Sequence, residues 1–201
     1  MVNVCILDYG SGNVKSVQNL LQYLKIRTIV SNKKENIKKS THIILPGVGA
    51  FGQSMKKLEK KVNIKALEEE VLTKKKPFLG ICVGMQLLAD ESDEFGKHKG
   101  LGWIGGKVRK LRSKILPHIG WNDIKIKSKS NIFKNLYEKD FYFLNSYHLV
   151  LKNKNLIMAE SVYEHKFCSV VQKQNIVGVQ FHPEKSQGAG KKIIQNFLEL
   201  N

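Results

Sequence analysis

The sequence has no long hydrophobic run and no basic segment ahead of its first apolar residues. No apolar run in the 201 residues approaches the ~20 residues that a membrane-spanning helix needs. The first residues, Met1 to Asp8, are typical of a buried strand, because no positively charged stretch precedes them as in a secretory signal. We therefore expect a cytoplasmic protein that makes no membrane contact.

Cysteine is also scarce, with three residues in the chain. In a cytoplasmic protein they are expected to be free thiols. Cys5 and Cys168 each lie in an apolar, strand-like run, which predicts small buried core residues. The chain has no cluster of cysteine and histidine at metal-ligand spacing, so we expect neither a metal nor another cofactor.

Acidic residues are few, with 17 Asp and Glu against 34 Lys and Arg and a net charge of +17. A basic protein can bind nucleic acid. Here the lysines are dispersed along the chain, and no recognition helix, zinc knuckle or aromatic stacking motif accompanies them. We expect a solvated lysine-rich surface and no nucleic-acid partner. The alternative is attraction of an acidic partner, or of a phosphorylated substrate that the partner holds.

The order of apolar segments predicts an α/β fold. Short apolar runs that read as strands occupy residues 2–7, 29–30, 42–45 and 78–81. Apolar residues at helical spacing occupy residues 14–24, 53–73, 84–90 and 189–200. Further strands are predicted at residues 107–111, 123–127, 141–144, 157–162, 168–172 and 176–181, with a helix at 131–138.

Alternating strands and helices predict a mostly parallel central sheet with helices on both faces. The β-rich second half is expected to add antiparallel strands at one edge. No linker, repeat or low-complexity segment interrupts the chain, so residues 1–201 are predicted to form a single domain.

The pattern Gly80-Ile81-Cys82-Val83-Gly84 marks a candidate nucleophile. It follows an apolar strand, precedes a helix and has the Gly-x-Cys-x-Gly spacing of a nucleophile elbow. The two glycines leave room around the strained turn. A helix beginning after Cys82 would favour its thiolate, and the Val83 amide would lie where an oxyanion forms.

A second motif, Phe181-His182-Pro183-Glu184, ends the strand predicted at 176–181. Proline holds the preceding residue extended, so Glu184 can reach the edge of the imidazole that faces away from Cys82. The residues then supply a nucleophile, a base and an orienting carboxylate, the composition of a Cys-His-Glu triad.

A third motif, Pro46-Gly47-Val48-Gly49, follows another strand. Two glycines around one valine allow backbone amides to turn inward, which suits a second oxyanion donor. A cysteine peptidase or deglycase of similar fold is a rival interpretation. Gln86, four residues after the cysteine, and the Pro-Gly-Val-Gly loop argue against it.

The three motifs, in this order, resemble those of the class I glutamine amidotransferases. Nearly the whole chain is similar to one branch of that family, the glutaminase subunits of imidazole glycerol phosphate synthase. The segments that carry this likeness are Asp8-Tyr9-Gly10-Ser11-Gly12-Asn13, Pro46-Gly47-Val48-Gly49-Ala50-Phe51, Pro117-His118-Ile119-Gly120-Trp121-Asn122, Asn145-Ser146-Tyr147-His148 and Phe181-His182-Pro183-Glu184-Lys185-Ser186.

The resemblance implies the class I amidotransferase fold and hydrolysis of glutamine by Cys82, His182 and Glu184. The ammonia would pass to a cyclase subunit, a (β/α)₈ barrel that forms a heterodimer with the chain and makes imidazole glycerol phosphate and AICAR in histidine biosynthesis. It implies that the residues that bind glutamine, and the oxyanion formed when the cysteine attacks it, are Gly47, Val48, Gly49, Val83, Gln86, Ser146 and Tyr147. It places the partner interface and ammonia gate at Asn13, Trp121, Tyr142 and Lys185.

One position departs from the family. His-Ser-Tyr or His-Thr-Tyr is usual where this chain has Asn145-Ser146-Tyr147. The surroundings of Trp103 and Tyr142 also resemble those of paralogues that serve surface-sugar amidation. An alternative function is therefore supply of ammonia to a nonulosonate or O-antigen amidotransferase.

Overall fold

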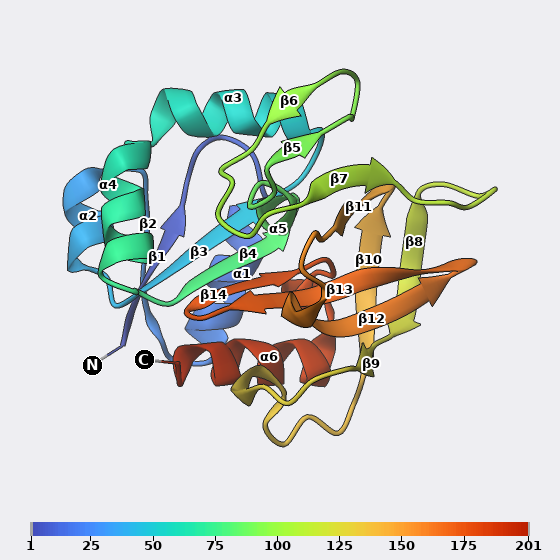
Figure 1. Cartoon of the computed structure of the whole chain (residues 1–201). Helices are drawn as coiled ribbons and strands as arrows, with labels where there is room; N and C mark the ends of the chain where they lie inside the picture. Colours follow the sequence, from blue (N-terminus) through green and yellow to red (C-terminus); the bar gives the residue numbers. More distant parts are fainter. Residues whose placement is uncertain (1, 201) are drawn as a thin grey trace.

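The computed structural model describes residues 2–200 and is built around an eight-stranded mixed sheet (Figure 1). The strand order is β2 (Arg27–Ser31), β1 (Asn3–Leu7), β3 (His42–Gly47), β4 (Phe78–Cys82), β14 (Ile176–Val179), β13 (His165–Lys173), β12 (Ile157–Tyr163) and β9 (Lys125–Ile126). The strands from β2 to β14 are parallel to their neighbours, and β13, β12 and β9 add antiparallel pairs at one edge. The expected sheet is therefore confirmed.

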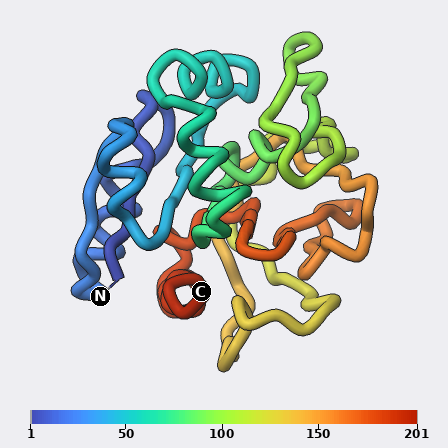
Figure 2. Tube along the Cα trace, turned by 60° about the vertical axis from the view of Figure 1, so that its left-hand side comes forward, coloured from blue at the N-terminus to red at the C-terminus, as the bar shows by residue number. Residues whose placement is uncertain are grey.

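Helices cover both faces of the parallel part of this sheet. They are α1 (Val14–Tyr23), α2 (Lys34–Lys39), α3 (Phe51–Lys61), α4 (Ile64–Glu68), α5 (Val83–Gln86) and α6 (Gln187–Leu198). Short 3-10 turns lie at η2 (Asn131–Phe133), η3 (Lys154–Leu156) and η4 (Pro183–Lys185), and a π-helical turn, η1 (Glu69–Thr73), continues α4. Helices α1 and α6 both pack on η4, whereas α2 contacts α4, so these two pairs cover opposite faces (Figures 1 and 2).

Two smaller sheets extend the β-rich half. One is the antiparallel pair of β8 (His118–Asp123) and β10 (Asp140–Asn145). The other has the order β11 (Tyr147–Val150), β7 (Lys107–Lys110), β5 (Glu91–Ser92) and β6 (His98–Lys99). The sequence predicts antiparallel strands only at the edge of the main sheet. The two small sheets are separate from the main sheet and were not predicted.

Three predicted helices are wrong in extent, and two of them lie away from Cys82. The one expected over 53–73 breaks at Val62, whose backbone is extended, and restarts where the Asn63 side chain accepts a hydrogen bond from the Ala66 amide at 3.0 Å. The helix expected over 131–138 is only the 3-10 turn η2. Lys134 leaves helical geometry and Asn135 has φ +53°, which ends the turn.

A continuous apolar core fills the space between the sheet and its helices. Cys5 and Cys168 lie within it as free, buried thiols, as the apolar runs around them predict. Burial raises the pKa of the Cys5 thiol to about 11 and raises that of Cys168 further. Within residues 2–200 no helix is long and apolar enough to cross a bilayer.

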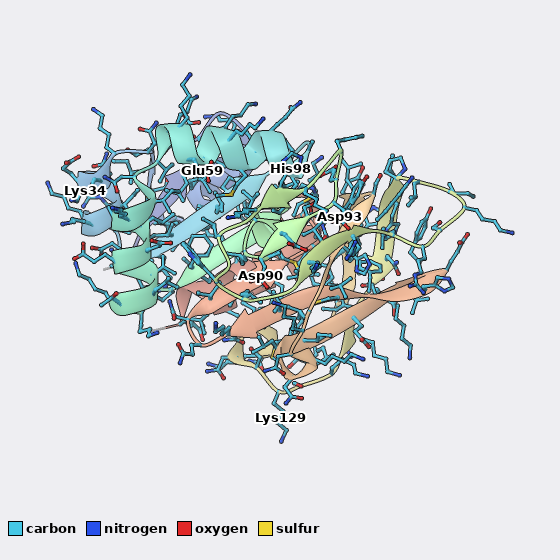
Figure 3. The ribbon with its side chains drawn as sticks, turned by 45° about the horizontal axis from the view of Figure 1, so that its top comes forward. Lys34, Glu59, Asp90, Asp93, His98 and Lys129 are labelled. Carbon is cyan, nitrogen blue, oxygen red and sulfur yellow. The ribbon has the colours of Figure 1, made fainter. Side chains whose placement is uncertain are left out.

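Two of the basic side chains, Lys34 and Lys129, come from different parts of the fold. Figure 3 shows Lys34 on α2 and Lys129 beyond β9 pointing outward from different parts of the molecule. The interpretation of the lysines as a solvated surface stays a prediction.

Candidate active site

The three sequence motifs meet at the carboxyl ends of adjacent parallel strands. Gly47 at the end of β3 is in register with Cys82 at the end of β4. On the other side of β4, Val179 pairs with Ile81, so the chain after β14 continues beside Cys82. Ligand sites of open α/β sheets lie at this edge. Parallel register therefore brings Cys82 close to Gly47, 35 residues earlier, and to the segment of His182, 100 residues later.

Cys82 stands at a strained turn between β4 and α5. Its backbone angles are φ +54° and ψ −111°, a sparsely populated region for a residue with a side chain. A Cβ on Gly80 would lie 2.6 Å from the Gly84 carbonyl oxygen, and one on Gly84 would overlap the Leu45 carbonyl. The glycines on both sides of the cysteine are thus required by close backbone approach, as the elbow pattern predicts.

Helix α5 is shorter than the sequence suggests. The expected helix over 84–90 is regular only from Val83 to Gln86, a single turn. A macrodipole grows with aligned peptides, so this turn contributes less to a thiolate than a long helix would. The local contacts of the Cys82 sulfur therefore carry more weight. The thiol lies 3.8 Å from the Leu144 carbonyl oxygen as donor, and 3.7 Å from Gln180 Nε2 as acceptor.

His182 lies where β14 gives way to η4, with 2 % of its side chain exposed. Its Nδ1 is 2.9 Å from Glu184 Oε1, which also accepts from Asn13 Nδ2 at 3.3 Å. Nε2 has no hydrogen bond within the part of the chain that is described, and the imidazole faces Cys82. This is the arrangement in which a carboxylate orients a base toward a nucleophile.

Electrostatics favour a protonated His182. Burial by itself would lower the pKa of the imidazole, because it disfavours the charged form. The adjacent Cys82 and Glu184 outweigh burial and raise the pKa of His182 well above its ordinary value. His182 can therefore carry a proton at neutral pH while it faces Cys82.

A cavity of about 200 Å³ opens beside the cysteine. Its walls are Val48, Gly49, Cys82, Val83, Gln86, Glu94, Pro117, Leu144, Asn145, Ser146, Tyr147 and His182. The predicted glutamine and oxyanion residues thus gather in one place, except Gly47. A Cβ on Gly47 would lie 2.5 Å from the Gly84 amide nitrogen, so this glycine permits contact between β3 and α5 rather than lining the cavity.

Hydrogen bonds from two serine hydroxyls fix the loop that contains Val48 and Gly49. Ser11 Oγ donates to the Val48 carbonyl at 2.7 Å, and Ser54 Oγ lies 3.5 Å from the same oxygen. Gly49 has φ +88°, a left-handed conformation that favours glycine. Val48 and Val83 both reach the cavity, and their roles as oxyanion donors stay predictions.

Sequence reasoning missed two polar residues at this site. Glu94 lines the cavity, and its Oε2 accepts from the Phe51 amide at 2.6 Å, while burial raises its pKa. It stands in the acidic run from Glu91 to Glu94, which does not reveal which carboxylate points inward. Gln180 is fully buried beside Cys82, and its only signal is a polar residue between two apolar ones just before the histidine.

Three of the four predicted interface residues form one surface. Tyr142 pairs with Trp121 across β10 and β8, with ring centroids 6.3 Å apart, and Lys185 Nζ lies 5.2 Å from the Tyr142 ring centre. The fourth, Asn13, instead donates its side-chain amide to Glu184. Among the described residues no cluster of three or more potential metal ligands occurs.

Known proteins share both the sequence and the fold. The sequence profile of the family described as glutamine amidotransferase class-I matches residues 5–200. A protein of Methanococcus maripaludis named imidazole glycerol phosphate synthase subunit HisH 2 is 44% identical, over 98% of each chain. A HisH subunit of Chlorobium chlorochromatii is 43% identical, over 98% of this chain and all of the relative.

A crystal structure of a glutamine amidotransferase superposes with a TM-score of 0.76 at 18% identity, covering 98% of this chain and 97% of the other. This likeness supports the fold, and the sequence relatives support the family. The chain belongs to the class-I glutamine amidotransferase family, and within it to the HisH subunits of imidazole glycerol phosphate synthase.

Proposed function

We propose that the chain hydrolyses glutamine to glutamate through a thioester on Cys82 and delivers the ammonia to a cyclase subunit in histidine biosynthesis. The observation that carries this proposal is the buried row of Cys82, His182 and Glu184, of which Cys82 and His182 lie in the wall of a small cavity. The cyclase would make imidazole glycerol phosphate and AICAR.

The chemistry follows from the positions of the side chains. The Cys82 thiolate attacks the glutamine carboxamide, and backbone amides of Val48 and Val83 receive the oxyanion. The His182 imidazolium gives a proton to the departing ammonia, with Glu184 fixing the ring through Nδ1. A water molecule that loses its proton to His182 then hydrolyses the thioester and restores the thiolate.

Glutamine recognition is assigned to groups around the cavity. Glu94 is the carboxylate in the wall, so it would receive the ammonium group of the substrate. The described residues place no lysine or arginine in that wall, so the substrate carboxylate would meet backbone amides near Gly49, Ser146 and Tyr147. The Gln86 amide completes the set.

The partner surface is proposed to be the outer face of the β8–β10 pair. Side chains alternate across this pair, with Phe141 and Phe143 buried and Ile119 and Trp121 turned outward. Ile119 is 59% exposed and Trp121 is 51% exposed, an apolar area that favours a protein contact. A (β/α)₈ barrel docked here would form a heterodimer.

Leu144 connects this face to the cavity. It belongs to the cavity wall, yet 37% of it is exposed on the outer side of β10. A partner that covers the β8–β10 pair would therefore touch the residue whose carbonyl faces Cys82. This wall is the proposed exit for ammonia, which would lose its nucleophilicity by protonation if it escaped to water.

A variant series tests the glutaminase part. Cys82→Ala and His182→Ala are expected to abolish glutamine hydrolysis, and Glu184→Gln to lower it strongly, while Cys168→Ser serves as the control that keeps activity. Full activity in the Cys82 or His182 variant would remove the triad assignment.

A reconstitution tests the pathway. The chain is mixed with glutamine and the histidine-pathway cyclase subunit from the same source, and glutamine-dependent imidazole glycerol phosphate is measured. We expect product, because the 43–44% identical relatives carry the name of that synthase. If no product forms, while a surface-sugar amidotransferase from the same source gains glutamine dependence, the pathway is wrong and the glutaminase survives.

A further inference from the structure

Gln180 is a buried glutamine that the reaction as described does not use. It is fully buried and follows β14 directly, two residues before His182. Its backbone amide donates to the Ser169 carbonyl at 2.9 Å, which fixes the main chain beside β13. Its side-chain Nε2 lies 3.7 Å from the Cys82 sulfur, within reach of a hydrogen bond to sulfur.

The orientation of the Gln180 amide is set by a second glutamine. Gln86 Nε2 donates to the Tyr147 carbonyl at 2.9 Å and to Gln180 Oε1 at 3.1 Å. Both partners are acceptors, so they use both N–H groups of Gln86 and fix which way its amide points. Because Gln180 Oε1 is occupied by that donor, its Nε2 must face the other way, toward Cys82.

We propose that Gln180 is a catalytic residue that donates a hydrogen bond to the Cys82 sulfur and stabilises the thiolate. This inference rests on the proposed function, in which that sulfur is the nucleophile. The second contact of the sulfur, the Leu144 carbonyl, can accept from a thiol but only repels a thiolate. Gln180 supplies the donor that favours the charged form.

The donor has opposite effects at different pH values. At neutral pH it increases the fraction of thiolate, and it also stabilises the sulfur as it leaves during thioester hydrolysis. Well above the ionisation midpoint the thiolate is fully formed without help, and a donor then slightly lowers its intrinsic nucleophilicity. A purely structural residue would lower the rate equally at every pH.

Other titratable groups also face the sulfur or its surroundings. They are His182 with Glu184 behind it, Tyr9, whose hydroxyl donates to the Pro46 carbonyl, and Glu94 and Tyr147 in the cavity wall. All of them stay unchanged in the variants below, so a difference between variants reports the glutamine amide.

The test uses Gln180→Met and Gln180→Leu, which replace the amide by an apolar side chain of similar volume that has no hydrogen-bond donor. Alkylation of Cys82 by iodoacetamide is followed over a pH range by mass spectrometry of its peptide. In the variants we expect the midpoint of the plot of alkylation rate against pH to rise by about one pH unit. Alkylation at neutral pH would then be roughly tenfold slower than in the wild-type protein, and the two rates would become equal at high pH. Glutaminase kcat at neutral pH should fall about tenfold with little change in KM.

Gln172→Met, a partly buried glutamine on β13 that bonds Ser130, is the matched control and should keep the wild-type profile. Wild-type midpoint and kcat in a folded Gln180 variant would overturn the inference. If neither variant folds, the side-chain amide resonance of Gln180 in the wild-type protein decides. The chemical shift of this resonance is expected to change with pH as Cys82 ionises, and a chemical shift that stays constant over that pH range would overturn the inference.

Failure of this inference is separable from failure of the proposed function. Labelling confined to Cys82 with an unchanged midpoint removes only the role of Gln180. Labelling at Cys5 or Cys168 with Cys82 unreactive removes the nucleophile itself.

Discussion

Replacing Gly80 by alanine tests whether the elbow around Cys82 depends on close backbone packing. Gly80 lies in β4, where the new Cβ would stand 2.6 Å from the Gly84 carbonyl oxygen and 2.8 Å from the Met85 amide nitrogen. Both are backbone atoms of the turn that starts α5, so no flexible side chain can move away. The backbone itself must shift.

The size of the shift sets the expected loss. Ordinary contacts of a Cβ lie at 3.4–4 Å, so α5 must move away from β4 by roughly 0.8 Å. Overpacking of this kind costs about 1–3 kcal/mol, which lowers Tm by roughly 2–4 °C per kcal/mol in a chain of this length. A displacement near 1 Å at reacting atoms costs about a hundredfold in rate, so we expect glutaminase activity to fall between tenfold and a hundredfold.

The assay pairs thermal unfolding with glutamine hydrolysis. Gly105→Ala is the matched control, since nothing lies within 4 Å of its Cβ and its φ of +84° adds strain without a clash. It should lower Tm by a few degrees and leave activity unchanged. Activity of the Gly80 variant within twofold of wild type would refute the packing argument, even with a lower Tm.

Three further predictions follow from burial and charge. Iodoacetamide should modify only Cys82 in the native protein, because burial raises the pKa of Cys5 and Cys168; modification of either at a similar rate would contradict this burial. Glu94→Gln should raise KM for glutamine about tenfold or more with kcat nearly kept, since it removes the charge opposite the substrate ammonium; an unchanged KM would exclude that contact. Glu70→Gln should flatten the loss of stability in acid. Burial alone would raise the pKa of Glu70, but the ammonium groups of Lys74 and Lys76, at 2.7 and 2.8 Å, lower it below the value of the unfolded chain. The ionised Glu70 carboxylate therefore stabilises the folded protein fully above the unfolded-chain pKa of about 4.3. This stabilisation is lost as the pH falls through the lower pKa that Glu70 has in the folded protein. Equal acid profiles for both proteins would contradict this.

The parallel strands and the positions of Cys82, His182 and Glu184 could be predicted from the sequence because each is a local pattern, while the catalytic roles of these residues stay a prediction. Buried strands such as β1 and β3 are continuous apolar runs, and Cys82 is marked by the glycines that its turn requires. His182 and Glu184 are two residues apart, so their contact needs no knowledge of the fold. The assignment of residues 1–201 to a single domain stays a prediction.

The parts that could not be predicted depend on contacts distant in sequence. Gln86 and Gln180 bond each other across 94 residues, and nothing local to either residue indicates the pair. The short strands β5 and β6 have two residues each, too few for a recognisable pattern, and are defined by the pairing of β5 with both β6 and β7. The break at Asn63 is a capping contact that competes with an otherwise helical pattern.

Asn145, which departs from the family, lies in the wall of the cavity rather than on the outer face of the β8–β10 pair. It is 6% exposed, its Nδ2 donates to the Tyr147 carbonyl at 3.0 Å, and its Oδ1 has no partner among residues 2–200. The same carbonyl accepts from Gln86, so Asn145 supports the two-glutamine network that reaches Cys82. An unpaired buried oxygen costs about 1–3 kcal/mol, which a donor from bound glutamine would offset. We therefore expect the departure to affect substrate binding and the alignment of the proposed nucleophile, Cys82, more directly than the choice of partner.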